Sequence, residues 1–329
     1  MIFFKQVKIL KGHTDLIESL VFSYNHNSLL TAGRDGKLLL WDTKLQKSYF
    51  SWSPYDGIEL YHADLSEDTR FVLACFSQYK EVKVYDRISE QIFCIPLLEY
   101  CQCPRFSIQN TSIISHTNRF IYQIDFCNHR GVKCLFKPDS KIKFFHLFKS
   151  RKLILISTQR GIVYIIDTQT GLPIAIIPHT YSNITFVSVS ADDSLVFIGD
   201  IKNRCIDIWK IEIYPFKIHI EHVRSYKLER KWSKEIFGCD IFYYGSFYFT
   251  DMEHAFVCSI PMRLAYINLS NKQYQILGEL GYCDTIAIDE DNKIVYCPCN
   301  KEQAEYPGSL GVFSYCLSQT SALAVDGKN

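Results

Sequence analysis

The sequence predicts an all-β fold built from a short unit of strands that is repeated along the chain. The β-branched and aromatic residues that favour strands are common, and Phe, Tyr and Trp alone make up 15% of the 329 residues. Apolar segments of strand length alternate with polar turns from one end to the other. Hydrophobic residues account for 47% of the chain, which is enough for a large core and excludes a disordered protein.

The clearest copy of the unit spans residues 12–42 and the strand that follows it. Between the second and third strands, the turn Arg34-Asp35-Gly36 places a glycine where a tight hairpin requires a positive φ. The four expected strands of this unit are residues 16–23, 28–32, 37–41 and 48–52.

The opening Gly12-His13 and the closing Trp41-Asp42 of this unit resemble the WD-repeat family, whose units are four-stranded blades of a β-propeller. The resemblance implies a structural hydrogen-bond network within the blade, formed by His13, Thr31, Asp35 and Trp41. Such a network satisfies the indole N–H and both imidazole nitrogens. An acid–base pair of His13 and Asp35 is the alternative interpretation.

Weaker copies of the third-strand ending recur along the chain, at residues 84–86, 123–125, 165–167, 208–210, 266–268 and 314–316. Counted from Trp41, the steps are 44, 39, 42, 43, 58 and 48 residues, and five of the six lie in or near the usual blade period. We therefore expect a single domain over residues 1–329, an all-β, seven-bladed β-propeller of four-stranded antiparallel blades. The expected blades are 16–52, 58–98, 103–136, 141–177, 184–223, 235–277 and 283–316.

The last expected blade shows three strands, and the segment 3–10 is a strand without a blade of its own. We expect this N-terminal strand to complete the last blade, because ring closure removes an exposed sheet edge. The sixth blade should begin with an inner strand near Ile236, and residues 317–329 should form a C-terminal tail. Six blades are the alternative if the unit at 104–136 is incomplete.

A narrower resemblance covers residues 152–171 and 193–209. These strings are similar to the small WD-repeat subunit shared by histone methyltransferase and RNA 3′-end processing complexes. The WD-repeat resemblance implies a non-catalytic scaffold, a subunit of a multiprotein complex that presents its loops to partner proteins or peptides. The sequence contains no nucleophile motif or phosphate-binding loop, so we expect no cofactor and no small-molecule substrate. The alternatives are an RNA-binding propeller and, more remotely, a propeller enzyme.

Two groups of residues are candidate interaction sites. Tyr and Arg are favoured interface anchors, and the loops between second and third and between fourth and first strands should gather on one face. The candidates on this partner face are Arg34, Tyr55, Tyr79, Lys80, Arg160, His179, Tyr181, Lys202, Arg204, Tyr282 and Tyr306. A basic docking segment for an acidic partner or RNA comprises Lys217, Arg224, Lys227, Arg230, Lys231, Trp232 and Lys234, although an ordinary outer strand explains it as well.

The spacing of the cysteines bears on metal binding, and the lack of targeting signals bears on cellular location. The spacing of Cys101 and Cys103, and of Cys297 and Cys299, is not that of a zinc knuckle even with His254 nearby, so no metal site is expected. The 13 cysteines follow no disulfide pattern, and no apolar segment has the length of a signal peptide or membrane span. We expect an intracellular protein, cytoplasmic or nuclear, whose near-neutral net charge of +1 argues against whole-molecule nucleic-acid binding.

Overall fold

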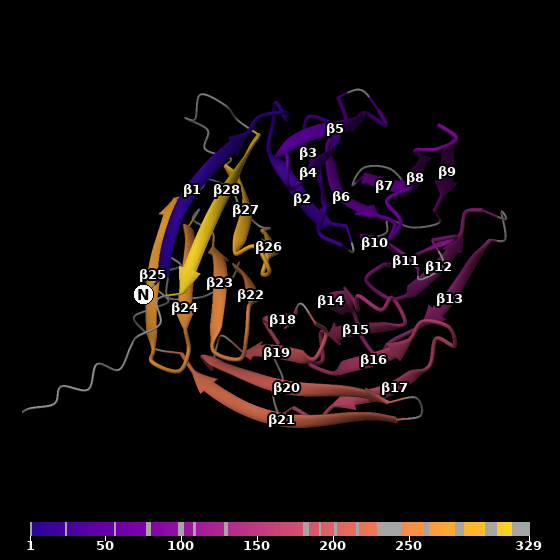
Figure 1. The fold of residues 1–329 in the computed structure, drawn as a ribbon. Coiled ribbons are helices and arrows are strands. Elements are labelled where there is room, and N and C mark those ends of the chain that lie inside the picture. Colours follow the sequence, from indigo (N-terminus) through magenta and orange to yellow (C-terminus); the bar gives the residue numbers. More distant parts are fainter. Residues whose placement is uncertain are drawn as a thin grey trace, which may run out of the picture.

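The computed structural model shows seven four-stranded antiparallel sheets arranged around a ring (Figure 1). The residues that it describes are 2–23, 25–55, 57–76, 80–97, 102–107, 110–127, 131–179, 184–190, 192–200, 203–214, 217–228, 245–259, 263–279, 286–299 and 308–317. The predicted fold class, a seven-bladed β-propeller, is confirmed, and the unit at 104–136 is a complete blade rather than the fragment that a six-bladed ring would need.

The first three blades follow the chain from inner to outer strand. Blade 1 consists of β2 (Ile17–Phe22), β3 (Ser28–Gly33), β4 (Leu38–Asp42) and β5 (Lys47–Trp52). Blade 2 consists of β6 (Leu60–Leu65), β7 (Phe71–Phe76), β8 (Glu81–Asp86) and β9 (Ile92–Pro96). Blade 3 consists of β10 (Gln102–Phe106), β11 (Ser112–His116), β12 (Ile121–Asp125) and β13 (Val132–Phe136).

The next three blades repeat the same order. Blade 4 consists of β14 (Ile142–Leu147), β15 (Leu153–Thr158), β16 (Val163–Asp167) and β17 (Pro173–Ile177). Blade 5 consists of β18 (Phe186–Val189), β19 (Leu195–Asp200), β20 (Cys205–Tyr214) and β21 (Lys217–Lys227). Blade 6 consists of β22 (Gly245–Phe249), β23 (His254–Ser259), β24 (Arg263–Asn268) and β25 (Gln273–Glu279).

Blade 7 joins the two ends of the chain. Its inner three strands are β26 (Ala287–Asp289), β27 (Ile294–Cys299) and β28 (Ser309–Leu317), and its outer strand is β1 (Ile2–Leu10). β1 runs antiparallel to β28 from Ile2 opposite Leu317 to Leu10 opposite Leu310. The expected closure by the N-terminal strand is confirmed, and the predicted tail beyond Leu317 lies outside the described residues.

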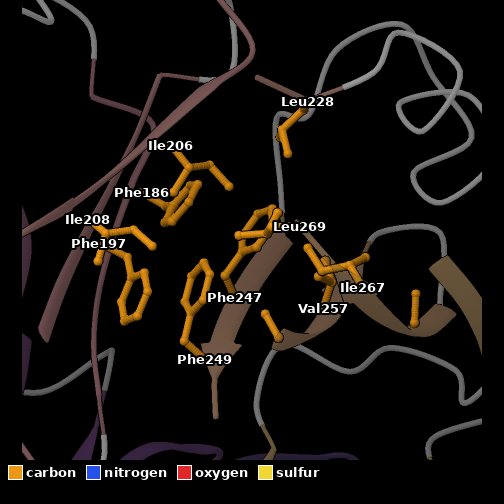
Figure 2. Close-up of a cluster of buried hydrophobic side chains, with 12 residues drawn as sticks. Phe186, Phe197, Ile206, Ile208, Leu228, Phe247, Phe249, Val257, Ile267 and Leu269 are labelled. Carbon is orange, nitrogen blue, oxygen red and sulfur yellow. The ribbon is translucent and has the colours of Figure 1, made fainter. Parts of the chain in front are cut away.

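The core lies between the blades. In the described part of the chain, each cluster of buried apolar side chains joins two neighbouring sheets, including one cluster that joins blade 7 to blade 1. Between blades 5 and 6 the contact is aromatic, and Figure 2 shows the rings facing one another. The ring centroids are 3.6 Å apart for Phe197 and Phe249 and 4.3 Å apart for Phe186 and Phe247. Gly199 makes room for this packing, since a Cβ there would lie 1.9 Å from the Phe186 ring.

Blade 5 has longer outer strands than expected. Strand β20 continues past Trp209 to Tyr214, and β21 returns opposite it with Cys205 paired to Lys227. The inner strand of blade 6 is β22, which begins at Gly245, and the expected start near Ile236 lies outside the described residues. The outer strand β21 extends beyond the expected end of the blade at residue 223 to Lys227, because no Gly or Pro ends the strand pattern there.

Candidate partner-binding face

The four residues of the expected blade network meet inside blade 1. His13 precedes β2, Thr31 lies in β3, Asp35 is in the turn after β3, and Trp41 lies in β4. The His13 Nδ1 atom is 2.9 Å from Asp35 Oδ1, and His13 Nε2 is 2.7 Å from Thr31 Oγ1. The Trp41 indole N–H donates to Thr31 Oγ1 at 2.9 Å. The network ties the entry to β2, the turn after β3 and the third strand into one unit.

This network lowers the pKa of the Asp35 carboxyl group. Burial alone would raise the pKa of the Asp35 carboxyl, but hydrogen bonds from His13 and from the Thr14 and Lys37 amides outweigh burial and lower this pKa. An ionised Asp35 accepts only, so the His13 proton lies on Nδ1 and, in the neutral imidazole, Nε2 accepts the Thr31 hydroxyl proton. Both side chains are almost fully buried, and their hydrogen-bond partners all lie within blade 1.

The second tryptophan on a third strand, Trp209, has no such partner. In blade 1, Trp41 pairs with Leu29, and Thr31 follows two residues later on the same side of β3. In blade 5, Trp209 pairs with Val196, and the position two residues later is Ile198. The Trp209 Nε1 atom is buried without a hydrogen-bond partner among the described residues, because an aliphatic side chain stands where blade 1 has a hydroxyl.

Two partner-face candidates, Arg34 and Tyr55, lie where blades 1 and 2 meet and are held by other side chains. Arg34 Nε donates to Glu18 Oε1 at 2.5 Å. The Tyr55 hydroxyl donates to Glu81, and the Lys83 ammonium lies 3.1 Å from the Tyr55 ring centroid. Gly36 lets the turn between β3 and β4 approach the connection between β5 and β6, since a Cβ there would lie 3.2 Å from the Tyr55 carbonyl oxygen. Tyr55 therefore braces its own loop, in addition to any role at the surface.

A second pair, Arg160 and His179, belongs to blade 4, where Arg160 lies in the turn before β16 and His179 follows β17. Arg160 is exposed and its Nη1 atom is 3.7 Å from Asp139 Oδ2. Burial lowers the pKa of His179 more than its hydrogen bond with the Gly161 backbone raises it. Of the remaining candidates, Lys80 is exposed in the turn before β8, and Arg204 is half-buried in the turn before β20. The described candidates form separate groups around the ring. The candidates Tyr79, Tyr181, Lys202, Tyr282 and Tyr306 lie outside the described residues.

The first half of the basic docking segment is the outer strand of blade 5. Lys217 begins β21 and Lys227 ends it. Arg224 Nη1 lies 3.3 Å from Glu253 Oε1 and 3.0 Å from the Tyr226 hydroxyl, so part of its charge is already balanced. The other members, Arg230, Lys231, Trp232 and Lys234, lie outside the described residues.

The residues considered for a metal site are dispersed. His254 bonds through Nδ1 to Asp251 at 2.8 Å and through Nε2 to the Asn268 amide at 2.8 Å. Cys297 is buried in the core between blades 6 and 7, and Cys101 lies outside the described residues. Within the described ranges, no group of three His, Cys, Asp or Glu side chains is placed to hold a metal ion.

Sequence analysis missed a cavity on this face between blades 3 and 4. It has a volume of about 600 Å³ and opens among three loops that are far apart in the sequence. Of its lining residues, only Arg160 was a candidate, because no local motif links the three loops. The lining comprises Arg119, Lys137, Pro138, Asp139, Ser140, Lys141, Gln159 and Arg160.

Comparisons with known proteins agree with this architecture. The fold is similar to the crystal structure of the β-propeller domain of Cps50 (Swd1) from Myceliophteria thermophila, with a TM-score of 0.71. The similarity covers 94% of this chain and 99% of that domain at 9% sequence identity, so it shows the fold alone. Residues 4–42 match the family model of the WD domain, G-beta repeat. The chain is a seven-bladed β-propeller that resembles the WD repeat over residues 4–42.

The segment that matches the WD-repeat model spans parts of two blades. It begins at Phe4 in β1, the outer strand of blade 7, and ends at Asp42, the last residue of β4 in blade 1. One sequence repeat therefore ties the last blade to the first. A search of curated proteins found no match to the sequence. The part of the propeller that the structure describes contains no helix long and apolar enough to cross a membrane.

Proposed function

We propose that this WD-repeat propeller is a non-catalytic scaffold, a subunit of a multiprotein complex that presents the loops of one face to partner proteins or peptides. The proposal is carried by the backbone hydrogen bonds that fasten these loops to one another. The amides of Arg34, Gln159 and Leu228 donate to carbonyls of the adjoining loop at Leu16, Lys141 and Arg204, over 2.7–2.8 Å. Because the loops are fixed before a partner arrives, binding costs little ordering entropy.

The resemblance of residues 152–171 and 193–209 to the small WD-repeat subunit of histone methyltransferase and RNA 3′-end processing complexes points to a more specific role. We propose complexes of these two classes as the first to test. A subunit of this kind would work inside the cell, in the nucleus or in the cytoplasm.

An RNA-binding propeller is the second candidate function, and β21 is the feature that favours it. Arg224 and Lys227 are exposed on this strand, with Tyr226 between them. The ion pair of Arg224 with Glu253 reduces the charge that would face a phosphate backbone, which makes this the weaker proposal. RNA binding through β21 would weaken steeply as salt is added, with a slope set by the number of phosphates contacted.

The test is affinity purification of the tagged full-length chain from its own cells, followed by identification of the co-purifying proteins. The face variant combines Lys80→Glu with Arg204→Glu, in the turns before β8 and β20. The control variant combines Lys5→Glu with Lys47→Glu, which are exposed on the outer strands β1 and β5 and change the net charge equally.

We expect a defined set of partners with the unmodified chain and the control variant, and loss of at least one partner with the face variant. The proposal is refuted if the chain purifies alone. It is also refuted if the face variant keeps every partner while the control variant loses them.

A further inference from the structure

The cavity between blades 3 and 4 is built from three loops of the predicted partner face. Arg119 comes from the turn between β11 and β12, and Gln159 and Arg160 come from the turn between β15 and β16. The segment 137–141, which connects β13 to β14, supplies the rest of the lining. The cavity thus bridges two blades, and its volume of about 600 Å³ lies within the range of ligand-binding clefts, about 300–1,000 Å³.

The three loops are fastened together around the opening. The Ile142 amide donates to the Asn118 carbonyl at 2.9 Å, which joins the segment 137–141 to the turn of blade 3. The Gln159 amide donates to the Lys141 carbonyl at 2.7 Å, and the Arg160 amide donates to Ser140 Oγ at 3.2 Å. The side chains around the cavity therefore project from a backbone that is set in advance.

The lining carries a marked excess of positive charge. Its four cations, Arg119, Lys137, Lys141 and Arg160, face a single carboxylate, that of Asp139. Asp139 accepts a hydrogen bond from the Tyr164 hydroxyl at 3.5 Å and lies 3.7 Å from Arg160. The Arg160 side chain is still 72% exposed, so its guanidinium can bind a second carboxylate. Clustered charge of one sign in a concave site attracts ligands of the opposite sign.

The same lining indicates which anionic ligand fits. Proteins that bind single-stranded RNA combine a basic groove with aromatic rings on which the bases stack. Among the described lining residues there is no aromatic side chain, and the Phe120 ring, which is not part of the lining, lies 5.6 Å from the Lys137 ammonium. Separate cations on a fixed backbone suit carboxylates that are spaced along an extended chain.

We propose that this cavity binds an acidic segment of a partner protein through the carboxylates of its Asp and Glu side chains. The proposal rests on the proposed function and gives the chemistry of one partner on the presented face. Arg160 and Arg119 flank the opening from two blades, and Lys137 and Lys141 approach from the segment between them. Four contacts from three loops also select the spacing of the carboxylates, which a flat basic surface would not do.

The experiment measures the binding of a fluorescently labelled peptide of alternating Glu and Gly to the purified full-length chain. The matched peptide has Gln in place of Glu. We expect binding of the Glu peptide that weakens as salt is added, and a loss of about tenfold in affinity for Lys137→Glu/Lys141→Glu. The control Lys5→Glu/Lys47→Glu, with the same net charge, should bind as the unmodified chain does.

A second variant should move affinity in the opposite direction. Asp139→Asn removes the one carboxylate from the lining but keeps an oxygen that can accept the Tyr164 hydrogen bond, so the Glu peptide should bind several-fold more tightly. Unfolding midpoints of all variants establish that they fold. Equal binding of the Gln peptide, or equal loss in the cavity and control variants, would overturn the inference, as would an RNA oligonucleotide that binds more tightly and is released by Lys137→Glu/Lys141→Glu.

Failure here and failure of the proposed function give different results. If purification recovers partners that depend on Lys80 and Arg204 but the Glu peptide does not bind, the scaffold proposal stands and the acidic partner is excluded. If the peptide binds as expected but the chain purifies without partners, the cavity has the chemistry inferred for it and the scaffold proposal fails.

Discussion

Replacing Thr31 by Val tests how much the hydrogen-bond network of blade 1 contributes to stability. The side chains have nearly the same shape, so packing in β3 is kept and only the hydroxyl is lost. That hydroxyl accepts from Trp41 Nε1 at 2.9 Å and bonds to His13 Nε2 at 2.7 Å. Thr31, His13 and Trp41 are all buried, so water cannot replace it without opening the blade.

The expected loss follows from counting these two groups. A buried polar group left without a partner costs about 1–3 kcal/mol, so the Trp41 N–H and the His13 nitrogen together cost roughly 2–6 kcal/mol. That is a large share of a typical unfolding free energy of about 5–15 kcal/mol. Urea unfolding, followed by tryptophan fluorescence and circular dichroism, measures the change. A loss below about 1 kcal/mol would refute the reasoning, since it would mean that the network is not a source of stability.

The reciprocal change, Ile198→Thr, tests whether a new hydrogen bond to the Trp209 indole stabilises the protein, apart from the cost of placing Thr in the core. Ile198→Thr places a hydroxyl at the position in blade 5 that corresponds to Thr31, beside the buried indole N–H of Trp209. Ile156 occupies the same register position in blade 4, where Ile166 stands in place of the tryptophan. Ile198→Thr should therefore destabilise the protein by about 1–3 kcal/mol less than Ile156→Thr. Equal losses would contradict the assignment of the indole as the unsatisfied donor.

Three further predictions concern closure, burial and packing. Deletion of residues 2–10 exposes the edge of β28 and removes the buried Ile2 and Leu10. The unfolding free energy should fall by roughly 3–6 kcal/mol, and the variant should self-associate. A variant that stays monomeric in ultracentrifugation and keeps its urea midpoint would contradict this. Burial lowers the pKa of His62 to about 4, so the unfolded chain takes up a proton first and stability falls as the pH decreases from 6.5 to 4, by no more than about 3 kcal/mol. His62→Gln should flatten this part of the pH profile, and a profile of unchanged slope would exclude His62 as its source. Gly199→Ala forces a Cβ into the Phe186 ring and should cost about 1–3 kcal/mol in thermal unfolding, whereas an unchanged midpoint would show that the ring moves freely.

The parts of the fold that follow a local pattern could be predicted from the sequence. The end of each third strand is a short local motif, so the repeats could be counted and the number of blades predicted. The N-terminal strand without a blade of its own predicted the ring closure. The full length of the hairpin of β20 and β21 could not be predicted, because the strand pattern continues beyond the expected end of the blade at residue 223 to Lys227 without a Gly or Pro signal. The cavity was also out of reach, since Arg119 and Arg160 belong to loops of different blades and come together only after the blades have packed.

The sequence motif and the fold depend on different interactions. The family match is confined to residues 4–42, yet seven complete blades are present. Blade 5 is an example: Ile198 stands where blade 1 has the hydroxyl that satisfies its tryptophan, while Phe197 stacks on Phe249 of blade 6 and keeps the two sheets together. The network within blade 1 consists of a few hydrogen bonds, whereas the clusters between blades bury many large apolar side chains around the ring. Packing between blades can therefore hold a propeller together where the motif is absent, which is consistent with a TM-score of 0.71 at 9% sequence identity.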